Sequence, residues 1–71
     1  MEYTDFLVET NNPDSLDKIL NNWGAALIGG GMPTGYEKID GYYIVRCFSD
    51  PGFIKFAIDN QGYGKVIRDI K

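Results

Sequence analysis

The chain has 71 residues, 44% of them hydrophobic and 24% charged, with a formal net charge of −3. This composition argues against disorder, and a chain this short buries only about 60% of the surface that its unfolded form exposes. The acidic balance and seven scattered basic residues argue against a nucleic-acid partner, because affinity for phosphates comes mainly from Lys and Arg. We therefore expect residues 1–71 to form one small domain.

The residue types that are rare or absent indicate where the protein works. A single cysteine, Cys47, allows no internal disulfide and indicates a reducing compartment. No apolar run approaches the roughly 20 residues that a membrane helix needs, and the acidic N-terminus predicts no signal peptide. We expect a cytoplasmic protein with no membrane partner.

The first strand and the first helix follow from hydrophobic periodicity. Residues 3–10 alternate as a strand, with Phe6 and Val8 as the expected core pair. Asp14 or Ser15 is the expected N-cap of the helix that follows. The apolar stripe of that helix recurs on a 3.6-residue period and comprises Leu16, Ile19, Leu20, Trp23 and Leu27. We expect Trp23 to be a core anchor, and Gly24 either to end the helix or to let it continue.

A glycine-rich segment comes next. Residues 29–35 contain Gly29, Gly30, Gly31 and Gly35, which give the backbone high freedom and predict an exposed loop. A phosphate-binding loop needs Gly-Lys-Ser/Thr opening a helix, whereas Tyr36 follows Gly35 here. We expect a flexible connection, and these four glycines form a second candidate contact site.

The central strand is predicted at residues 42–48, which are mostly β-branched or aromatic. Residues 36–39 are expected to form the short strand before it, joined to it by a hairpin turn at Asp40-Gly41. Tyr43, Val45 and Cys47 are uniformly apolar and should face the helices. Cys47 is accordingly expected to be a buried packing residue.

The second helix is predicted after Ser49 or Asp50 as its cap, with Pro51 at its first position. One of its faces should carry Phe53, Phe56, Ala57 and Asn60, widened by Ile54 and Ile58. A strand over residues 53–58 is the alternative, which the cap, the proline and Gly62 disfavour. Gly64 then opens the last strand, residues 65–71.

The order strand, helix, strand, strand, helix, strand is that of the ferredoxin-like βαββαβ sandwich. The fold class expected is therefore α+β, with a four-stranded antiparallel sheet and both helices on one face. The first and third strands should lie in the middle of that sheet.

Two segments resemble the ACT domains, which are small regulatory modules. Residues 9–20 run from a strand through a proline turn into a leucine-rich helix, and Asp14 stands where that family usually has glycine. Residues 53–66 contain a helix that ends at a glycine–aromatic pair before a final strand. The resemblance implies a regulatory domain that binds a small amino acid near residues 11–16.

The residues with catalytic chemistry are sparse. There is no histidine, which removes the usual general base and the usual metal ligand. The acidic residues are spread over turns and helix starts, where they cap helices and favour solubility. We expect no enzyme activity, no cofactor and no metal.

The uncovered face of the sheet is the expected contact surface. Its predicted residues are Tyr3, Leu7, Tyr42, Ile44, Arg46 and Phe48. RNA-recognition modules stack bases on such rings, but the acidic balance argues against RNA here. A contiguous apolar patch marks a protein contact unless another segment covers it or the rings are scattered. The partner is then another protein or a second copy of the chain.

Two functions are compatible with these patterns. One is a non-enzymatic interaction module, an inhibitor or adaptor, by analogy with small acidic domains that include phage proteins blocking a host defence complex. The other is the amino-acid-binding regulatory domain that the ACT resemblance implies.

Overall fold

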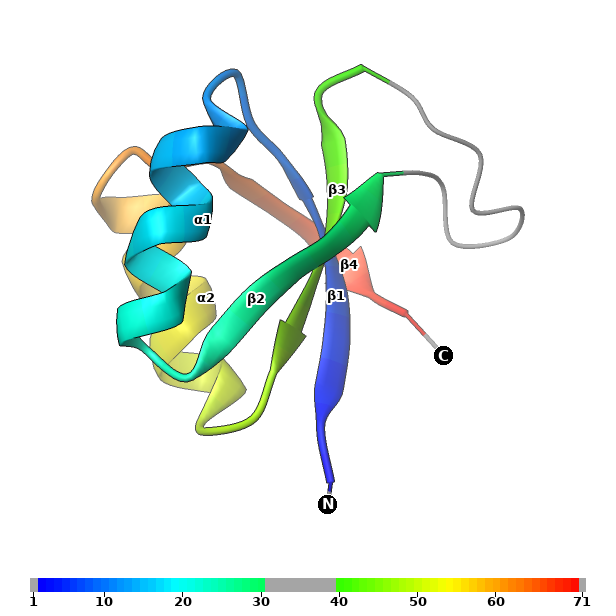
Figure 1. The fold of residues 1–71 in the computed structure, drawn as a ribbon, viewed down its shortest axis with the longest axis vertical. Coiled ribbons are helices and arrows are strands. Elements are labelled where there is room, and N and C mark those ends of the chain that lie inside the picture. The colour runs from blue at the N-terminus through cyan, green and yellow to red at the C-terminus, as the bar shows by residue number, and fades with distance from the viewer. Residues whose placement is uncertain (1, 31–39, 71) are drawn as a thin grey trace.

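The computed structural model describes residues 2–30 and 40–70, which form a sheet with two helices on one of its faces (Figure 1). Its elements in chain order are β1 (Thr4–Glu9), α1 (Pro13–Asn22), β2 (Ala25–Gly30), β3 (Tyr42–Cys47), α2 (Pro51–Asn60) and β4 (Lys65–Asp69). The sheet order is β2-β3-β1-β4 and every neighbouring pair is antiparallel. The predicted ferredoxin-like α+β fold, with the first and third strands in the middle, is confirmed.

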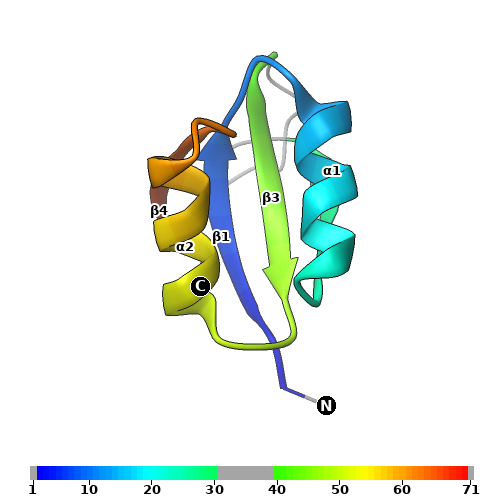
Figure 2. The same cartoon turned by 90° about the vertical axis from the view of Figure 1, so that its left-hand side faces the viewer.

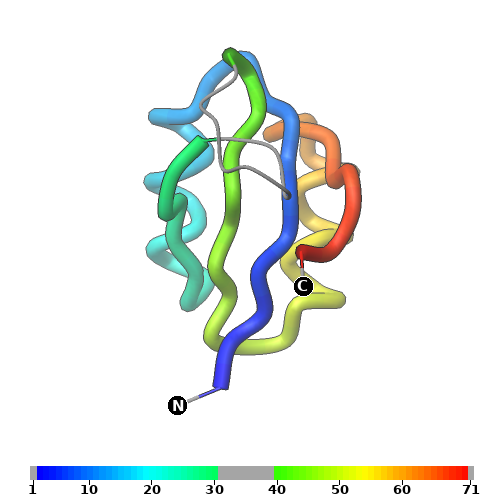
Figure 3. Tube along the Cα trace, turned by 90° about the vertical axis from the view of Figure 1, so that its right-hand side faces the viewer, coloured from blue at the N-terminus to red at the C-terminus, as the bar shows by residue number. Residues whose placement is uncertain are grey.

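The helices and the strands form two layers. Figure 2 shows α1 and α2 in front of β1 and β3, and Figure 3 shows the opposite face of the sheet. In the part of the chain that the structure describes, neither helix is long and apolar enough to cross a membrane.

The second strand lies earlier in the chain than the sequence predicts. Gly24 has φ +77°, a conformation that glycine adopts without strain, and the chain turns there from α1 into β2. Leu27 is therefore a strand residue opposite Val45 and no part of the helical stripe. Gly29 and Gly30, predicted to lie in a loop, end β2 instead. The strand predicted at residues 36–39 lies outside the described residues, as do Gly31 and Gly35.

The core lies between the sheet and the helices, on the strand faces that alternation predicts. Its fully buried side chains come from both central strands and both helices, and include Phe6, Val8, Val45, Cys47, Leu16, Leu20, Ile54 and Ile58. The assignment of Val45 and Cys47 to the helix side of β3 is confirmed, while Tyr43 is half-buried.

The helix starts use the residues that backbone chemistry requires. Asp50 caps α2, since its carboxylate accepts the N–H of Gly52 at 2.9 Å, and Pro51 occupies the first position as predicted. The cap of α1 is Asn12, whose Oδ1 accepts the N–H of Ser15 at 3.2 Å. Asp14 and Ser15, the predicted caps, lie inside that helix because Pro13 already fits its first position.

Two expectations about side-chain faces are wrong. Helix α2 turns Ile54, Ala57 and Ile58 toward the sheet, and these positions form one stripe on a 3.6-residue period. Phe53 and Phe56 lie off that stripe and are 55% and 67% exposed. Trp23, which was expected to be a core anchor, is instead half-buried at the end of α1, where it packs against the outside of the core.

Cys47 should be chemically quiet in the native protein. It is 1% exposed, and its Sγ donates a hydrogen bond to the Ser49 carbonyl at 3.3 Å. A thiol reagent at neutral pH reaches it only when the fold opens, so native labelling should be slower than labelling in denaturant by a factor of about 150 to 5,000, for a stability of about 3–5 kcal/mol. Equal rates in the two conditions would contradict the burial of this residue.

Candidate functional site

The predicted contact residues on the uncovered sheet face fall into two groups. Tyr3 and Phe48 are 51% and 48% exposed, whereas Leu7 and Ile44 are only 1% and 3% exposed. Tyr42 and Arg46 are half-buried. The expectation that Leu7 and Ile44 form an exposed apolar surface is therefore wrong. The two residues lie directly opposite each other on β1 and β3, at the centre of the sheet.

Four residues at one end of this face form a small cluster, which we call the Tyr3 ledge and which consists of Tyr3, Asp5, Arg46 and Phe48. Arg46 forms a bidentate pair with Asp5, with both N–O distances at 3.0 Å. Its guanidinium lies 3.9 Å from the centroid of the Tyr3 ring, and that ring meets Phe48 edge-on at 6.2 Å. Arg46, predicted to be a polar anchor for a partner, has its charge compensated within the chain.

A larger aromatic cluster lies on the helix side, and we call it the aromatic helix surface (Trp23, Phe53, Phe56 and Tyr63). The Trp23 ring meets Phe53 at 5.9 Å and Tyr63 at 6.0 Å, both edge-on. Phe53 and Phe56 are three residues apart on α2, so their side chains are neighbours along the helix. The rings of Trp23, Phe53 and Tyr63 thereby join the end of α1 to the first turn of α2 and to the turn that follows α2.

The charged residues of α2 are turned away from this surface. Lys55 forms an ion pair with Asp69 of β4, and the Asp59 carboxylate accepts the N–H of Val66 at 2.9 Å. The exposed polar side chains close in sequence to the rings include amides and charged groups, namely Asn22, Asn60, Gln61, Asp50, Asp59 and Lys65. The aromatic helix surface is therefore apolar at its centre, and the two charged side chains of α2 make their polar contacts with β4.

Sequence reasoning missed this surface because it assigned Phe53 and Phe56 to the buried face. A signal was available in the composition of the helix. Ile54, Ala57 and Ile58 already supply a complete apolar stripe, so the two phenylalanines are in excess of what one face can bury.

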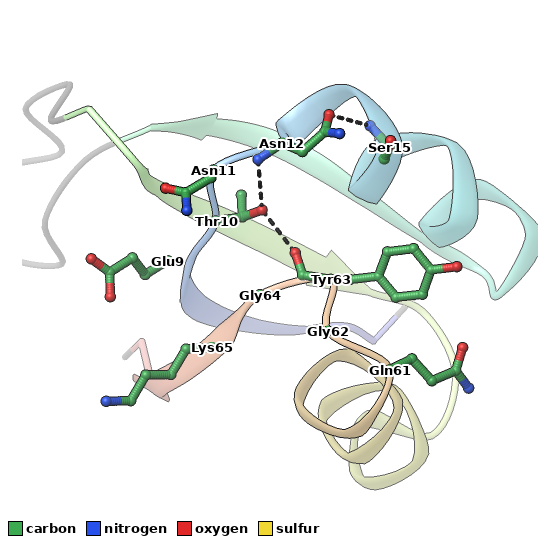
Figure 4. Close-up of a pocket in the computed structure, with 10 residues that line it drawn as sticks. All are labelled: Glu9, Thr10, Asn11, Asn12, Ser15, Gln61, Gly62, Tyr63, Gly64 and Lys65. Atoms are coloured by element: carbon green, nitrogen blue, oxygen red, sulfur yellow. Dashed lines mark hydrogen bonds between the residues drawn. The ribbon is translucent and has the colours of Figure 1, made fainter.

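The region where the ACT resemblance predicts an amino-acid site contains a polar depression of about 710 Å³ (Figure 4). It lies between the turn that joins β1 to α1 and the turn that joins α2 to β4. Thr10, 5% exposed, holds the two turns together, because its hydroxyl donates to the Tyr63 carbonyl at 2.7 Å and accepts from the Asn12 N–H at 3.1 Å.

The backbone at this depression is closely packed. A Cβ on Gly64 would lie 2.8 Å from the Glu9 carbonyl oxygen, so only glycine fits there. The N–H groups of Ser15 and Leu16 are already bonded to the side chain and the carbonyl of Asn12. The donors with which a helix start binds a ligand carboxylate are thus partly occupied by the chain itself.

Residues 2–30 and 40–70 contain no group of three or more His, Cys, Asp or Glu side chains placed to hold a metal ion. Comparison with protein-family models, with curated proteins and with solved structures finds no match to this chain. Inference about function therefore depends on the geometry of the described residues.

The Thr10 hydroxyl should contribute to stability as the link between the two turns. Thr10→Val leaves the Tyr63 carbonyl and the Asn12 N–H without their partner and should lower the free energy of unfolding by about 1–3 kcal/mol. Thr4→Val is the matched control, because Thr4 is half-buried at the start of β1, the strand that Thr10 follows, and its hydroxyl has no hydrogen bond among the described groups. Urea unfolding of both variants measures the difference, and equal losses would contradict the role of Thr10.

Proposed function

We propose that this chain is a non-enzymatic protein-interaction module, an inhibitor or adaptor, that docks on a larger protein through the aromatic helix surface. The observation that carries the proposal is the exposure of Phe53 and Phe56, at 55% and 67%, one helical turn apart, with Phe53 beside Trp23. A single exposed apolar residue is ordinary, but a group of large rings on one surface is typical of a contact site.

The chemistry of the surface supports this proposal. The centres of protein interfaces are rich in aromatic residues and poor in charge, and Trp and Tyr are frequent among the residues that dominate binding energy. Trp23 is held edge-on by two other rings, so its position is fixed before a partner arrives. Less side-chain freedom is then lost on binding, which favours affinity.

The Tyr3 ledge is the second contact candidate and ranks below the aromatic helix surface. Its two exposed rings are Tyr3 and Phe48, while Leu7 and Ile44 beside them are buried. The patch predicted from sequence is therefore smaller than expected, and the bidentate contact with Asp5 offsets the charge of Arg46.

The amino-acid-binding regulatory domain is supported only by the polar depression near Thr10. Its backbone donors at Asn12, Ser15 and Leu16 are engaged in bonds within the chain. A ligand would have to replace these bonds, which lowers its net gain. The interaction module is therefore the better-supported function.

A paired set of variants tests the contact surface. Phe53→Ser with Phe56→Ser should weaken partner binding by about 30-fold or more, since removing one interface hot spot costs about 2 kcal/mol or more. Tyr3→Ser with Phe48→Ser removes two rings of equal kind from the Tyr3 ledge and should leave binding unchanged. Affinity capture of the partner with each tagged variant, followed by titration of the purified partner, measures the effect.

Other outcomes of these measurements would contradict the proposal. Loss of binding in the ledge variant alone would move the contact to the sheet. Light scattering that shows a stable dimer, disrupted by the helix variant, would identify the partner as a second copy. A melting temperature raised by one of the twenty amino acids would favour the regulatory domain, because only a ligand of the native state stabilises it.

A further inference from the structure

The two edges of the sheet differ in how they are protected. Strands β2 and β4 are the outer strands (Figure 3). Strand β4 carries Lys65, Arg68 and Asp69, the charged side chains with which proteins discourage pairing at an exposed edge. Strand β2 reads Ala-Ala-Leu-Ile-Gly-Gly and carries no charge. Its edge lacks this protection.

Hydrogen bonding identifies which groups of β2 point outward. The Gly24 carbonyl accepts the N–H of Phe48 at 2.9 Å, so Gly24 is turned toward β3. Alternation along an antiparallel strand then directs the N–H and C=O of Ala25 and Leu27 away from β3. Among the described residues, no strand pairs with that side of β2.

A small acidic depression adjoins the end of this edge. It measures about 280 Å³, and its walls include Asp14 and Asp17 of α1, Leu27 of β2 and Tyr43 of β3. Neither carboxylate takes part in a hydrogen bond or ion pair within residues 2–30 and 40–70. Pro13, Gly29 and Gly30 complete the lining, and a Cβ on Gly29 would meet nothing within 4 Å. Space for an incoming side chain is therefore open between the strand edge and the two carboxylates.

We infer that the β2 edge receives an extended segment of a partner protein as an added strand, with a lysine or arginine of that segment in the acidic depression. Main-chain hydrogen bonds to Ala25 and Leu27 would hold the segment, as in other cases of strand addition. The basic side chain can lay its aliphatic stem on Leu27 and Tyr43 while its charge meets Asp14 and Asp17.

Charge selects this occupant over a second copy of the chain. A second copy pairing β2 with β2 brings only the side chains of alanine, leucine, isoleucine and glycine to the edge. It would cover the Asp14 and Asp17 carboxylates without supplying a cation, which is unfavourable for buried charge. This contact lies on the α1 and β2 side of the fold, whereas the aromatic helix surface lies mainly on α2, so it does not depend on the proposed function.

Two synthetic peptides test the inference on the full chain. Each is a capped seven-residue peptide of alternating threonine and valine, one with a central lysine and the other with a central glutamate. At millimolar concentration the lysine peptide should slow hydrogen exchange of the Ala25 and Leu27 amides, measured by NMR. The glutamate peptide should bind about tenfold more weakly, because it places a like charge beside two carboxylates.

Matched variants separate the effect of the two carboxylates on peptide binding from the effect of the net charge. Asp14→Asn with Asp17→Asn should abolish the preference for lysine over glutamate. Glu2→Gln with Glu9→Gln changes the net charge by the same amount. Both residues are exposed, Glu2 before β1 and Glu9 at its end, so this variant should keep the preference for the lysine peptide. The Phe53→Ser and Phe56→Ser variant should bind the lysine peptide as the unchanged chain does, which separates this test from that of the aromatic helix surface.

Three results would overturn the inference. The first is an absence of slowed exchange at Ala25 and Leu27 with either peptide. The second is equal binding of the two peptides by the unchanged chain. The third is protection of these amides that rises with protein concentration when no peptide is present, which would make a second copy the occupant.

Discussion

The pairing of β1 with β3 is the interaction on which the other elements depend. The two strands pair without interruption from Thr4 opposite Cys47 to Glu9 opposite Tyr42. On the helix side this ladder presents Phe6, Val8 and Val45, all fully buried, and both helices pack there. On the other side Leu7 and Ile44 are also buried. A central pair of strands buried on both faces leaves little freedom of register, because a shift by one residue would exchange the two sets of side chains.

The ends of this ladder fix the turns and, through them, the edge strands. The Thr10 N–H donates to the Gly41 carbonyl at 2.8 Å, and the Thr10 hydroxyl donates to the Tyr63 carbonyl. At the other end the Ser49 hydroxyl donates to the Trp23 carbonyl at 2.9 Å, which ties the end of α1 to the start of α2. Trp23 is held beside Phe53 by this arrangement. The position of the aromatic helix surface is thus a consequence of the backbone at the ends of β1 and β3.

Sequence patterns predicted those parts of the fold in which local chemistry and tertiary packing agree. The start of α2 was predicted from Asp50 and Pro51, which act on the adjacent backbone. The two faces of β3 were predicted from the alternation of its side chains, which is also a local pattern. Strand β2 was missed since Ala25 and Ala26 favour a helix and Leu27 also fits the helical period. The backbone conformation of Gly24 decides whether residues 25–27 continue the helix or form a strand. The sequence shows only that glycine can adopt the conformation that ends the helix.

The candidate site was less predictable for a related reason. Helix α2 has more apolar residues than the sheet can cover, and its orientation over β1 and β4 selects which of them are exposed. Composition alone does not determine that orientation. The Tyr3 ledge similarly depends on the register that places Asp5 opposite Arg46, since only then do the carboxylate and the guanidinium meet. Long-range register of this kind is a property of the folded sheet.

The two proposed contact surfaces differ in chemistry as well as in position. The aromatic helix surface offers a group of large rings, while the β2 edge offers backbone hydrogen bonds next to two carboxylates. One surface favours an apolar patch of a folded partner, and the other favours an extended segment with a basic side chain. Strand β2 lies beside α1 and β4 lies beside α2 (Figures 1 and 2), so occupants of the two surfaces approach from different sides of the molecule. Simultaneous engagement would raise the affinity of a partner that carries both features, since the second contact forms at high effective concentration. A domain with a core this small can then hold a partner firmly without a large interface at either surface.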